Sequence, residues 1–460
     1  MTDTAQLNST DQVIDELRDW LSTNWDPDLT VAAWWERLGL AGWSAPTLPT
    51  NAYGRGLSRN DGVRVAQEID RFGALGAPAG LGLLLAAPTI ATHGTQEQID
   101  SFVRDIVTGQ KSWCQLFSEP AAGSDLAGLQ TRAVRDGDEW IVNGQKVWTS
   151  GGQHSNLGML LARTNPEVPK HQGITYFALE MIQPGVEIRP LREMTGRALF
   201  NEVFMTDARV ANDALIGGEN NGWAVANTTL ANERAGLGSG GGSGAGGSVL
   251  PGTVGGGLDR RAGDFGSGAR TSNGNGSGNG KAKSGSKASE DGAEDAAMVR
   301  ALSGGIKLLT ELAKSNGSII DPLVRQGLAQ LYTWGELGRF NGLRMKAVKA
   351  AGGDIPGMPN ISKLSMSHIM RLTRDLGLQI SGAAGMLHGY NQKDRAALEA
   401  ATGNTLVGFV TELAMFAQAP SIYGGTDQVQ RNIIGERVLG LPKEPNNDRT
   451  TPFSELPKNV

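Results

Sequence analysis

Two short stretches of the chain combine small residues, hydroxyls and an indole in a way that suits contact with a flat ligand. They are Trp113–Asp125, WCQLFSEPAAGSD, and Asn143–Gly152, NGQKVWTSGG. Ser118, Ser124 and Ser150 supply hydroxyls and Trp148 supplies the indole, while the small residues between them let the backbone approach closely. Such an arrangement favours a site for the edge of an aromatic cofactor. An ordinary glycine-rich loop followed by a hairpin is the alternative interpretation.

Two other glycine-rich stretches resemble phosphate-binding loops only superficially. Residues 240–247 follow no predicted strand, and no acidic residue stands at the distance that a dinucleotide-binding unit requires. Gly280 and Lys281 are followed by Ala282 rather than Ser or Thr, and position 275 holds Asn where a phosphate loop needs Gly. The sequence therefore predicts neither a dinucleotide fingerprint nor a nucleoside triphosphate site.

Composition excludes several classes of protein. The net charge of −5 and the pI of about 5.7 supply no basic field for nucleic acid or an anionic membrane. Cys114 is the only cysteine and the five histidines show no ligand spacing, so we predict no disulfide and no metal. The longest apolar run, residues 81–87, is far shorter than a membrane span, and the first residues lack the features of a signal peptide. We therefore expect a cytoplasmic protein without a nucleic-acid partner.

Three regions with different hydrophobic periods position these stretches. Residues 1–111 follow a helical period from near Ser9, which with Gln12 three positions on resembles a capping box. Residues 112–218 shift toward a period of two, with the turn pairs Asp136-Gly137 and Asn143-Gly144 around a short extended run. Residues 219–460 return to a helical period. The order predicts an α+β fold with a helical N-terminal domain, a middle antiparallel β domain and a C-terminal helical bundle. The expected core of the first region is formed by Trp34, Trp35, Leu38, Leu40 and Trp43.

Residues 238–297 interrupt the last region and contain 20 of the chain's 65 glycines. A stretch of this composition buries too little apolar surface to offset the entropy lost on ordering, so we interpret it as a flexible insertion. A mobile lid or a docking segment for a partner is one hypothesis for its role. A tolerated surface loop is the other.

The chain resembles the acyl-CoA dehydrogenase family over nearly its whole length outside this insertion. The motifs that carry the resemblance, in the family's order, are HGTQEQ (93–98), SEPAAGSD (118–125), WTSG (148–151), LIGGENNGW (215–223) and IYGGTDQVQR (422–431). The resemblance implies an N-terminal helical domain, a β-barrel-like middle domain and a C-terminal four-helix bundle. It also implies an oxidoreductase of bacterial fatty-acid or sterol side-chain type, which uses FAD to convert an acyl-CoA to the trans-2-enoyl-CoA, as in β-oxidation.

The resemblance further implies where cofactor and substrate are held. The implied FAD-binding residues are Gln115, Phe117, Ser118, Gly123, Ser124, Trp148, Ser150, Gln379, Gly382, Thr426 and Gln428. The implied substrate-binding residues are Ser124, Tyr423 and Gly424, with the backbone N–H of Gly424 bonding the thioester carbonyl. Gln379 and Gly382 would reach the flavin of a neighbouring subunit, so the resemblance implies a dimer or tetramer. It also implies an electron-transferring flavoprotein as the oxidant.

The catalytic base is implied by elimination within the family pattern. The reaction needs a carboxylate on one face of the α carbon and the flavin on the other. Much of the family places this glutamate after the tyrosine near the C-terminus, where this chain has Tyr423-Gly424. A second branch, which includes isovaleryl-CoA-type enzymes, carries it on the first long helix of the C-terminal domain, directly before an arginine. That position reads Glu233-Arg234, so Glu233 is the implied base. An ordinary solvated Glu-Arg pair on a helix is the alternative.

The stretch Ala313–Gly317 departs from the family pattern, because it lacks the arginine and phenylalanine of a motif that contacts FAD across the dimer. Lys314 would replace the arginine only as a point charge. The departure leaves open a homo-oligomer or a hetero-oligomer with a related subunit. Two rival functions stay open as well: another flavin oxidation on the same fold, such as nitroalkane oxidation or monooxygenation, and a non-catalytic or partner-dependent subunit. The sequence does not decide acyl length, branching or a steroid acyl group.

Overall fold

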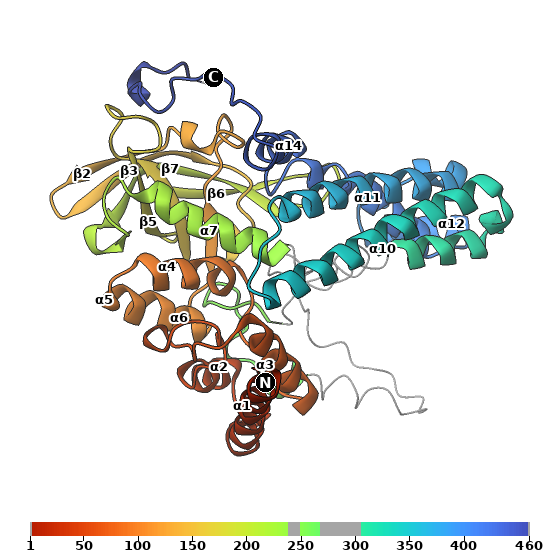
Figure 1. Cartoon of the computed structure of the whole chain (residues 1–460), viewed down its shortest axis with the longest axis horizontal. Helices are drawn as coiled ribbons and strands as arrows, with labels where there is room; N and C mark the ends of the chain where they lie inside the picture. Colours follow the sequence, from red (N-terminus) through yellow and green to blue (C-terminus); the bar gives the residue numbers. More distant parts are fainter. Residues whose placement is uncertain (1, 238–248, 267–304, 459–460) are drawn as a thin grey trace.

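The computed structural model describes residues 2–237, 249–266 and 305–458. Within them, a helical N-terminal region is followed by a sheet and then by a helical C-terminal region, which is the α+β arrangement expected from the sequence. Figure 1 shows the N-terminal helices below the sheet and the C-terminal helices extending to one side. None of the described helices is both long enough and apolar enough to span a membrane.

The N-terminal region is built around buried indoles. Its helices are α1 (Thr2–Asn24), α2 (Val31–Leu40), α3 (Arg59–Phe72), α4 (Ala87–His93), α5 (Gln96–Gln98) and α6 (Arg104–Val107). Helix α1 starts well before Ser9, since no proline or glycine stops it there, so the predicted capping box is wrong. Four of the five predicted core residues are buried, whereas Leu40 is 49% exposed at the end of α2. The indole N–H groups of Trp34 and Trp35 donate to Leu75 O and Gly76 O, which satisfies them inside the core.

Eight strands make up the middle sheet. They are β1 (Trp113–Leu116), β2 (Arg132–Asp136), β3 (Glu139–Lys146), β4 (Leu157–Arg163), β5 (Ile174–Glu180), β6 (Val186–Leu191), β7 (Phe200–Ala211) and β8 (Leu215–Ile216). Their order is β6-β7-β3-β2-β4-β5-β8, and β1 pairs with β4 beside this path. Because β1 and β4 run parallel, the sheet is mixed, whereas the sequence predicted an antiparallel domain. Strand β1 enters from the N-terminal helices rather than through a hairpin, so no tight turn sets its direction.

The two predicted turn pairs behave differently. Asp136-Gly137 joins β2 to β3 as expected, with Gly137 at φ 63°. Asn143-Gly144 lies inside β3, where the pairing with β7 shifts register. A Cβ at Gly144 would stand 2.7 Å from the Cα of Thr131, so glycine permits both a bulge and a close approach of two segments. The second prediction of a turn is therefore wrong.

The C-terminal region starts with α7 (Gly222–Leu237), which lies between the sheet and the N-terminal helices (Figure 1). Residues 305–315 are helical, and the later helices are α10 (Pro322–Ala350), α11 (Met358–Ser381), α12 (Gln392–Thr402), α13 (Leu406–Phe416) and α14 (Asp427–Ile433). Leucine and valine side chains from these helices form a separate core. After α14 the chain returns over the sheet region, as the dark blue segment of Figure 1 shows.

Residues 249–266 fall in the segment that composition marked as a flexible insertion, yet they pack against the N-terminal helices. Three of their side chains join the core that holds the indoles: Val249, Leu258 and Ala262. The N–H of Val31 at the start of α2 donates to Arg260 O at 2.8 Å, and Asn156 donates to Thr253 Oγ1 at 2.8 Å. Apolar residues between the glycines therefore give this stretch a fixed position that composition did not reveal. The rest of the expected insertion, 238–248 and 267–297, lies outside the described residues.

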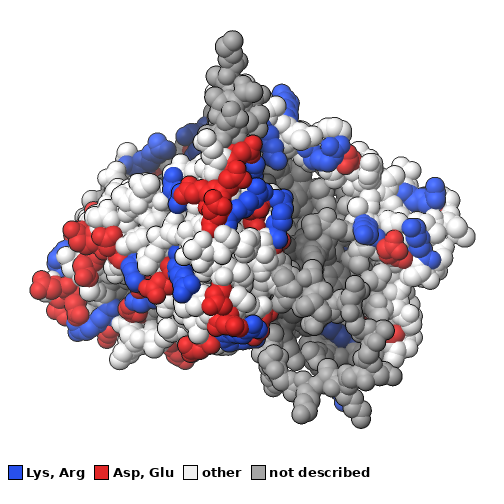
Figure 2. Space-filling model, turned by 90° about the horizontal axis from the view of Figure 1, so that it is seen from below, with Lys and Arg blue, Asp and Glu red and all other residues white. Residues whose placement is uncertain are grey.

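Charges are mixed on the face that the N-terminal helices form. Figure 2 views this face from below and shows acidic and basic side chains interspersed over the part not drawn in grey. Arg18 pairs with Asp15 at 3.0 Å and Arg64 pairs with Asp11 at 2.8 Å. Exposed pairs of this kind contribute little to stability, but they leave no extended field of one sign on this face.

Candidate functional site

Glu233, the implied base, points its carboxylate toward the first strand of the sheet. It lies near the C-terminal end of α7, and Gln115 Nε2 on β1 donates to its Oε2 at 3.4 Å. Burial raises the pKa of Glu233, although the bond from Gln115 and the charge of Arg234 oppose this effect. A raised pKa suits a carboxylate that acts as a general base near neutral pH. Glu233 is therefore half-buried beside Gln115, and its role as the base stays a prediction.

The helix that carries Glu233 is fixed on both sides. Thr229 shares a buried hydrogen bond with Thr89 of α4 at 2.9 Å. The neighbouring Thr228 Oγ1 shares another with His93 Nε2, one turn further along α4, at 2.8 Å. Helix α7 also packs on β5, so its carboxylate is held by rigid elements rather than by a loop.

A buried ion pair organises the loop that follows β1. Lys146 is fully buried, and its ammonium donates to Glu119 Oε1 at 2.8 Å and to Phe117 O at 3.0 Å. The carboxylate of Glu119 also accepts the backbone N–H groups of Gln130 and Thr131. These three contacts of the Glu119 carboxylate close residues 118–131 into one loop, which we call the Ser118–Thr131 loop. Gly123 and Ser124 lie exposed at its tip.

The Trp148 loop lies beside this first loop. The N–H of Val147 donates to Ser118 O at 2.9 Å, and Asn201 of β7 exchanges backbone bonds with Thr149. Trp148 has φ 63°, a left-handed backbone that a bulky residue rarely adopts, and its side chain is 56% exposed. Such strain is typical of functional sites. Its ring meets the ring of Phe200 edge-on at 5.7 Å, so the indole has a set orientation with an open face.

The other predicted residues lie on the C-terminal region. Gly424 has φ 63°, and its carbonyl accepts a bond from Gln430 Nε2 at 3.0 Å. Thr426 caps α14 by accepting the N–H of Val429, and Gln428 is exposed on the first turn. Tyr423 is partly buried, which raises the pKa of its hydroxyl. Among the described residues, no hydrogen bond joins this segment to Glu233.

Gln379 and Gly382 are exposed where α11 ends. The stretch 313–317, which differs from the family pattern, contacts this end of α11, because Asn316 Nδ2 donates to Ile380 O at 2.7 Å. Lys314 is exposed and pairs with Glu311 at 3.6 Å on its own helix. The structure therefore places the stretch 313–317 beside the end of α11 that carries Gln379 and Gly382, and Lys314 is already paired with Glu311.

Three charged residues were not identified from the sequence as part of the site: Glu119, Lys146 and Lys170. Glu119 and Lys146 stand inside the quoted stretches, but a sequence does not show that two charges 27 positions apart are buried together. Lys170 holds Asp125, the last residue of the first stretch, at 2.9 Å. Cys114 on β1 is buried, which raises the pKa of its thiol to about 12 and leaves it unreactive.

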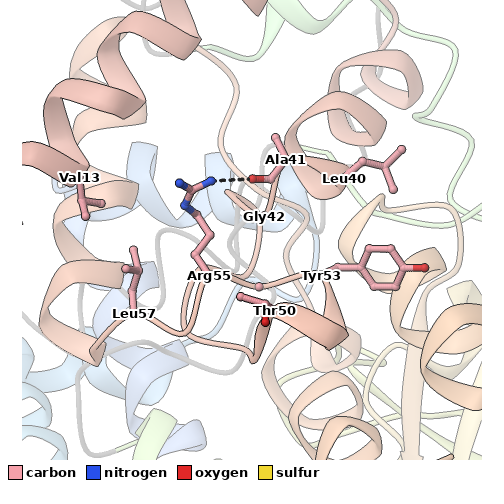
Figure 3. A pocket seen from close by; sticks show the side chains of 9 residues that line it. Val13, Leu40, Ala41, Gly42, Thr50, Tyr53, Arg55 and Leu57 are labelled. Carbon is pink, nitrogen blue, oxygen red and sulfur yellow. Dashed lines mark hydrogen bonds between the residues drawn. The ribbon is translucent and has the colours of Figure 1, made fainter. Parts of the chain in front are cut away.

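The cavity in Figure 3 is separate from these residues. It has a volume of about 380 Å³ and lies among α1, α2 and the segment before α3. Arg55 at its wall donates to Ala41 O at 3.1 Å, pairs with Glu16 and covers the ring of Trp43. Because this cation is already engaged and no carboxylate lines the cavity, it lacks the groups that the predicted chemistry needs.

Replacing Gln115 with leucine should move the acidic limb of the pH–activity profile to higher pH. The Gln115 amide stabilises the ionised form of Glu233, so its loss raises the pKa of that carboxyl further. Activity should fall at pH 6 and recover at pH 9, by less than about tenfold because the bond is long. Gln145→Leu, which removes a similar bond to Glu202 elsewhere, is the control. A change of equal size at every pH would contradict this role.

Three family models match the chain. The model of the acyl-CoA dehydrogenase N-terminal domain matches residues 3–110. The models of the middle and C-terminal domains of the same family match residues 114–208 and 296–439. The acyl-CoA dehydrogenase IpdE1 of Mycobacterium tuberculosis is 33% identical over 412 residues, which cover 90% of this chain and 88% of the relative. The acyl-CoA dehydrogenase FadE34 of the same organism is 50% identical over 198 residues, 43% of this chain and 27% of that protein.

Solved structures also align with this chain over nearly its whole length. The ChsE4-ChsE5 complex from Mycobacterium tuberculosis aligns with a TM-score of 0.63 and 25% identity, covering 95% of this chain and 98% of that chain. An acyl-CoA dehydrogenase from Geobacillus kaustophilus aligns with a TM-score of 0.59 over 94% of this chain and 98% of that chain. At 22% identity, this second likeness concerns the fold alone.

Proposed function

This chain belongs to the acyl-CoA dehydrogenase family, and we propose that it dehydrogenates an acyl-CoA thioester between its α and β carbons, with Glu233 as base and FAD as acceptor. One observation carries the proposal. Glu233, at the position where one branch of the family carries its base, is half-buried, has a raised pKa and lies on a helix held by rigid elements. The chain is accordingly an oxidoreductase by family.

The residues around the Trp148 loop suit a flavin. The exposed indole on a strained backbone offers a flat apolar face, and Gly123 and Gly151 have open space where a Cβ would stand. The buried hydroxyl of Thr149 has no hydrogen-bond partner among the described residues, so it is free for a ligand atom. Bound FAD would supply the two-electron acceptor. Ser118, Trp148 and Ser150 would hold its ring, while Gln379, Gly382, Thr426 and Gln428 would contact the rest.

Glu233 would take the proton from the α carbon. Its carboxylate then becomes a neutral acid, which burial favours over the charged form. Gln115 keeps one oxygen of Glu233 engaged, so the other is directed to the substrate.

The negative charge that develops on the thioester oxygen needs a donor. The N–H of Gly424 takes part in no hydrogen bond among the described residues, so it is available for this role. Losing one donor of this type typically costs about 3 kcal/mol of transition-state stabilisation. A glycine at this position keeps the N–H although it lacks the carboxylate that many relatives carry there. Ser124 and Tyr423 would line the same substrate.

A second candidate function is a partner-dependent subunit. It is favoured by the altered stretch at 313–317, where the one cation is already paired with Glu311. Exposed large apolar residues on α10 and just before it favour an assembly of either kind, because such side chains often mark an interaction surface. They are Ile320 in the turn before the helix and Leu323, Tyr332, Leu337, Phe340 and Leu343 on α10. We propose a dimer or tetramer, made of identical chains or of this chain and a related one, with an electron-transferring flavoprotein as the oxidant.

An anaerobic visible spectrum tests the proposal. Purified protein should show oxidised flavin bands that bleach on addition of one member of a panel of straight, branched and steroid-side-chain acyl-CoAs. Native mass measured on the same sample gives the assembly. A colourless protein that does not take up added FAD would favour the partner-dependent subunit. Flavin bands that no acyl-CoA bleaches would favour another flavin oxidation, such as nitroalkane oxidation.

A further inference from the structure

The segment after α14 returns across the molecule and lies on the connection between β4 and β5. We call residues 441–458 the C-terminal strap. Its backbone is bound to that connection: the N–H of Phe453 donates to Val168 O at 2.9 Å, and the N–H of Ser454 donates to Pro166 O at 2.8 Å. Phe453 is buried although the strap has little regular structure. Figure 1 shows this dark blue segment beside the upper edge of the sheet.

Phe453 covers a buried cation. The guanidinium of Arg163, 4% exposed, stands 3.7 Å from the centre of the Phe453 ring. On its other side Arg163 donates to Ala127 O at 2.6 Å and to Leu129 O at 3.3 Å, both in the Ser118–Thr131 loop. Carbonyls and a ring face therefore hold a charge that burial would otherwise make costly.

Asp448 engages a second buried cation in the same way. The ammonium of Lys170 pairs with Asp448 of the strap at 2.5 Å. It also pairs with Asp125 of the Ser118–Thr131 loop at 2.9 Å. The two carboxylates thus share one ammonium that is largely withdrawn from water. Asp125 directly follows Ser124 at the tip of the loop.

Both buried cations consequently contact the strap on one side and the Ser118–Thr131 loop on the other. We infer that the C-terminal strap positions this loop, with Phe453 and Asp448 as positioning residues that act on Ser124 through Arg163 and Lys170. The inference rests on the proposed function only where it concerns Ser124 and the acyl-CoA. The effect on the loop itself follows from the contacts alone.

Removing either side chain should loosen the loop. Without Phe453, water reaches Arg163 and competes with the carbonyls of Ala127 and Leu129. Without the Asp448 charge, Lys170 keeps only one carboxylate and becomes free to turn toward solvent. The loop tip then samples more positions, and binding at Ser124 weakens more than the chemistry after binding.

Hydrogen exchange of the full-length protein, as purified with its flavin, tests the effect on the loop. In Phe453→Ala, amides of residues 118–131 should exchange at least about tenfold faster, while those of α10 keep their wild-type rates. Asp448→Asn should act in the same direction, and Phe453→Trp should restore protection. The matched control is Glu444→Gln, which removes an exposed carboxylate from the same strap without touching either cation. Unchanged exchange at 118–131, or equally faster exchange throughout, would overturn the inference.

Kinetics of the same variants separate positioning from general stability. The KM for acyl-CoA should rise about tenfold in Phe453→Ala with kcat within about twofold of wild type, because binding is weakened and the bound state still reacts. A fall in kcat with an unchanged KM would contradict this. If the wild type bleaches with no acyl-CoA, the proposed function fails by itself, while the exchange experiment still decides the role of the strap.

Discussion

Replacing Glu233 with glutamine is expected to lower the rate of acyl-CoA dehydrogenation by about 10²–10⁴-fold, the usual contribution of a positioned base. Glutamine has nearly the same size and keeps an oxygen that can accept the bond from Gln115. It cannot take a proton from the α carbon. The flavin should stay bound, because Glu233 is not among the residues that would hold it. Rapid anaerobic mixing with acyl-CoA, followed in the visible spectrum, measures the rate of bleaching directly.

Glu219→Gln is a suitable control, since this glutamate is exposed before α7 and pairs only weakly with Arg135 at 3.7 Å. It should bleach at the wild-type rate. Bleaching of Glu233→Gln at the wild-type rate would show that another group is the base. Loss of the flavin bands in Glu233→Gln would show instead that the residue supports the cofactor.

The raised pKa of Glu233 also predicts how activity and stability depend on pH. Activity needs the carboxylate, so kcat/KM should rise with pH through a value above the ordinary range for glutamate. Stability should change in the opposite sense. At low pH the group is neutral in both the folded and the unfolded chain, and above its unfolded pKa ionisation is more costly in the folded chain. Glu233→Gln should therefore unfold at a higher temperature than wild type at pH 8 and at the same temperature near pH 4.

Family motifs made most of the candidate site predictable, because they are local in sequence. The helix–sheet–helix order followed from hydrophobic period alone and is confirmed. Closure of the sheet into a barrel, a C-terminal four-helix bundle and the domain limits 1–111, 112–218 and 219–460 stay predictions. So do the roles of the site residues. The contact between Gln115 and Glu233 joins positions 118 apart, and no local pattern indicates it.

The fixed positions of two segments, 249–266 and 441–458, could not be predicted, because their average composition is that of a loop. Residues 249–266 are rich in glycine, yet Leu258 and Ala262 among them are buried in the N-terminal core. The strap 441–458 has no helical or strand period, and one ring and one carboxylate account for its contacts with buried cations. In both cases a few side chains determine the position of a segment whose average composition suggests a loop.

Lys146→Met is expected to cost about 3–5 kcal/mol of folding stability, the typical effect of leaving one member of a buried ion pair without its partner. Burial opposes ionisation of Glu119, but the charge of Lys146 and the bonds from Lys146, Thr131 and Gln130 outweigh it and lower the pKa of this carboxyl. Without Lys146 the carboxylate remains buried with only backbone donors. Phe117 O loses its donor at the same time. Denaturant unfolding, followed by tryptophan fluorescence, measures the loss.

The double variant Lys146→Met/Glu119→Gln tests whether the charge is the cause. A neutral amide still accepts one of the N–H groups of Gln130 and Thr131 and leaves no unpaired charge, so it should recover part of the lost stability. Lys111→Met is the surface control, because Lys111 makes only long pairs of 3.6 and 3.8 Å and should change stability by less than about 0.5 kcal/mol. If the double variant is as unstable as Lys146→Met, packing of the lysine stem rather than its charge holds the Ser118–Thr131 loop. Recovery would mean that the ion pair sets the position of the loop that carries Ser118 and Ser124, two of the three hydroxyls from which the sequence first indicated a cofactor site.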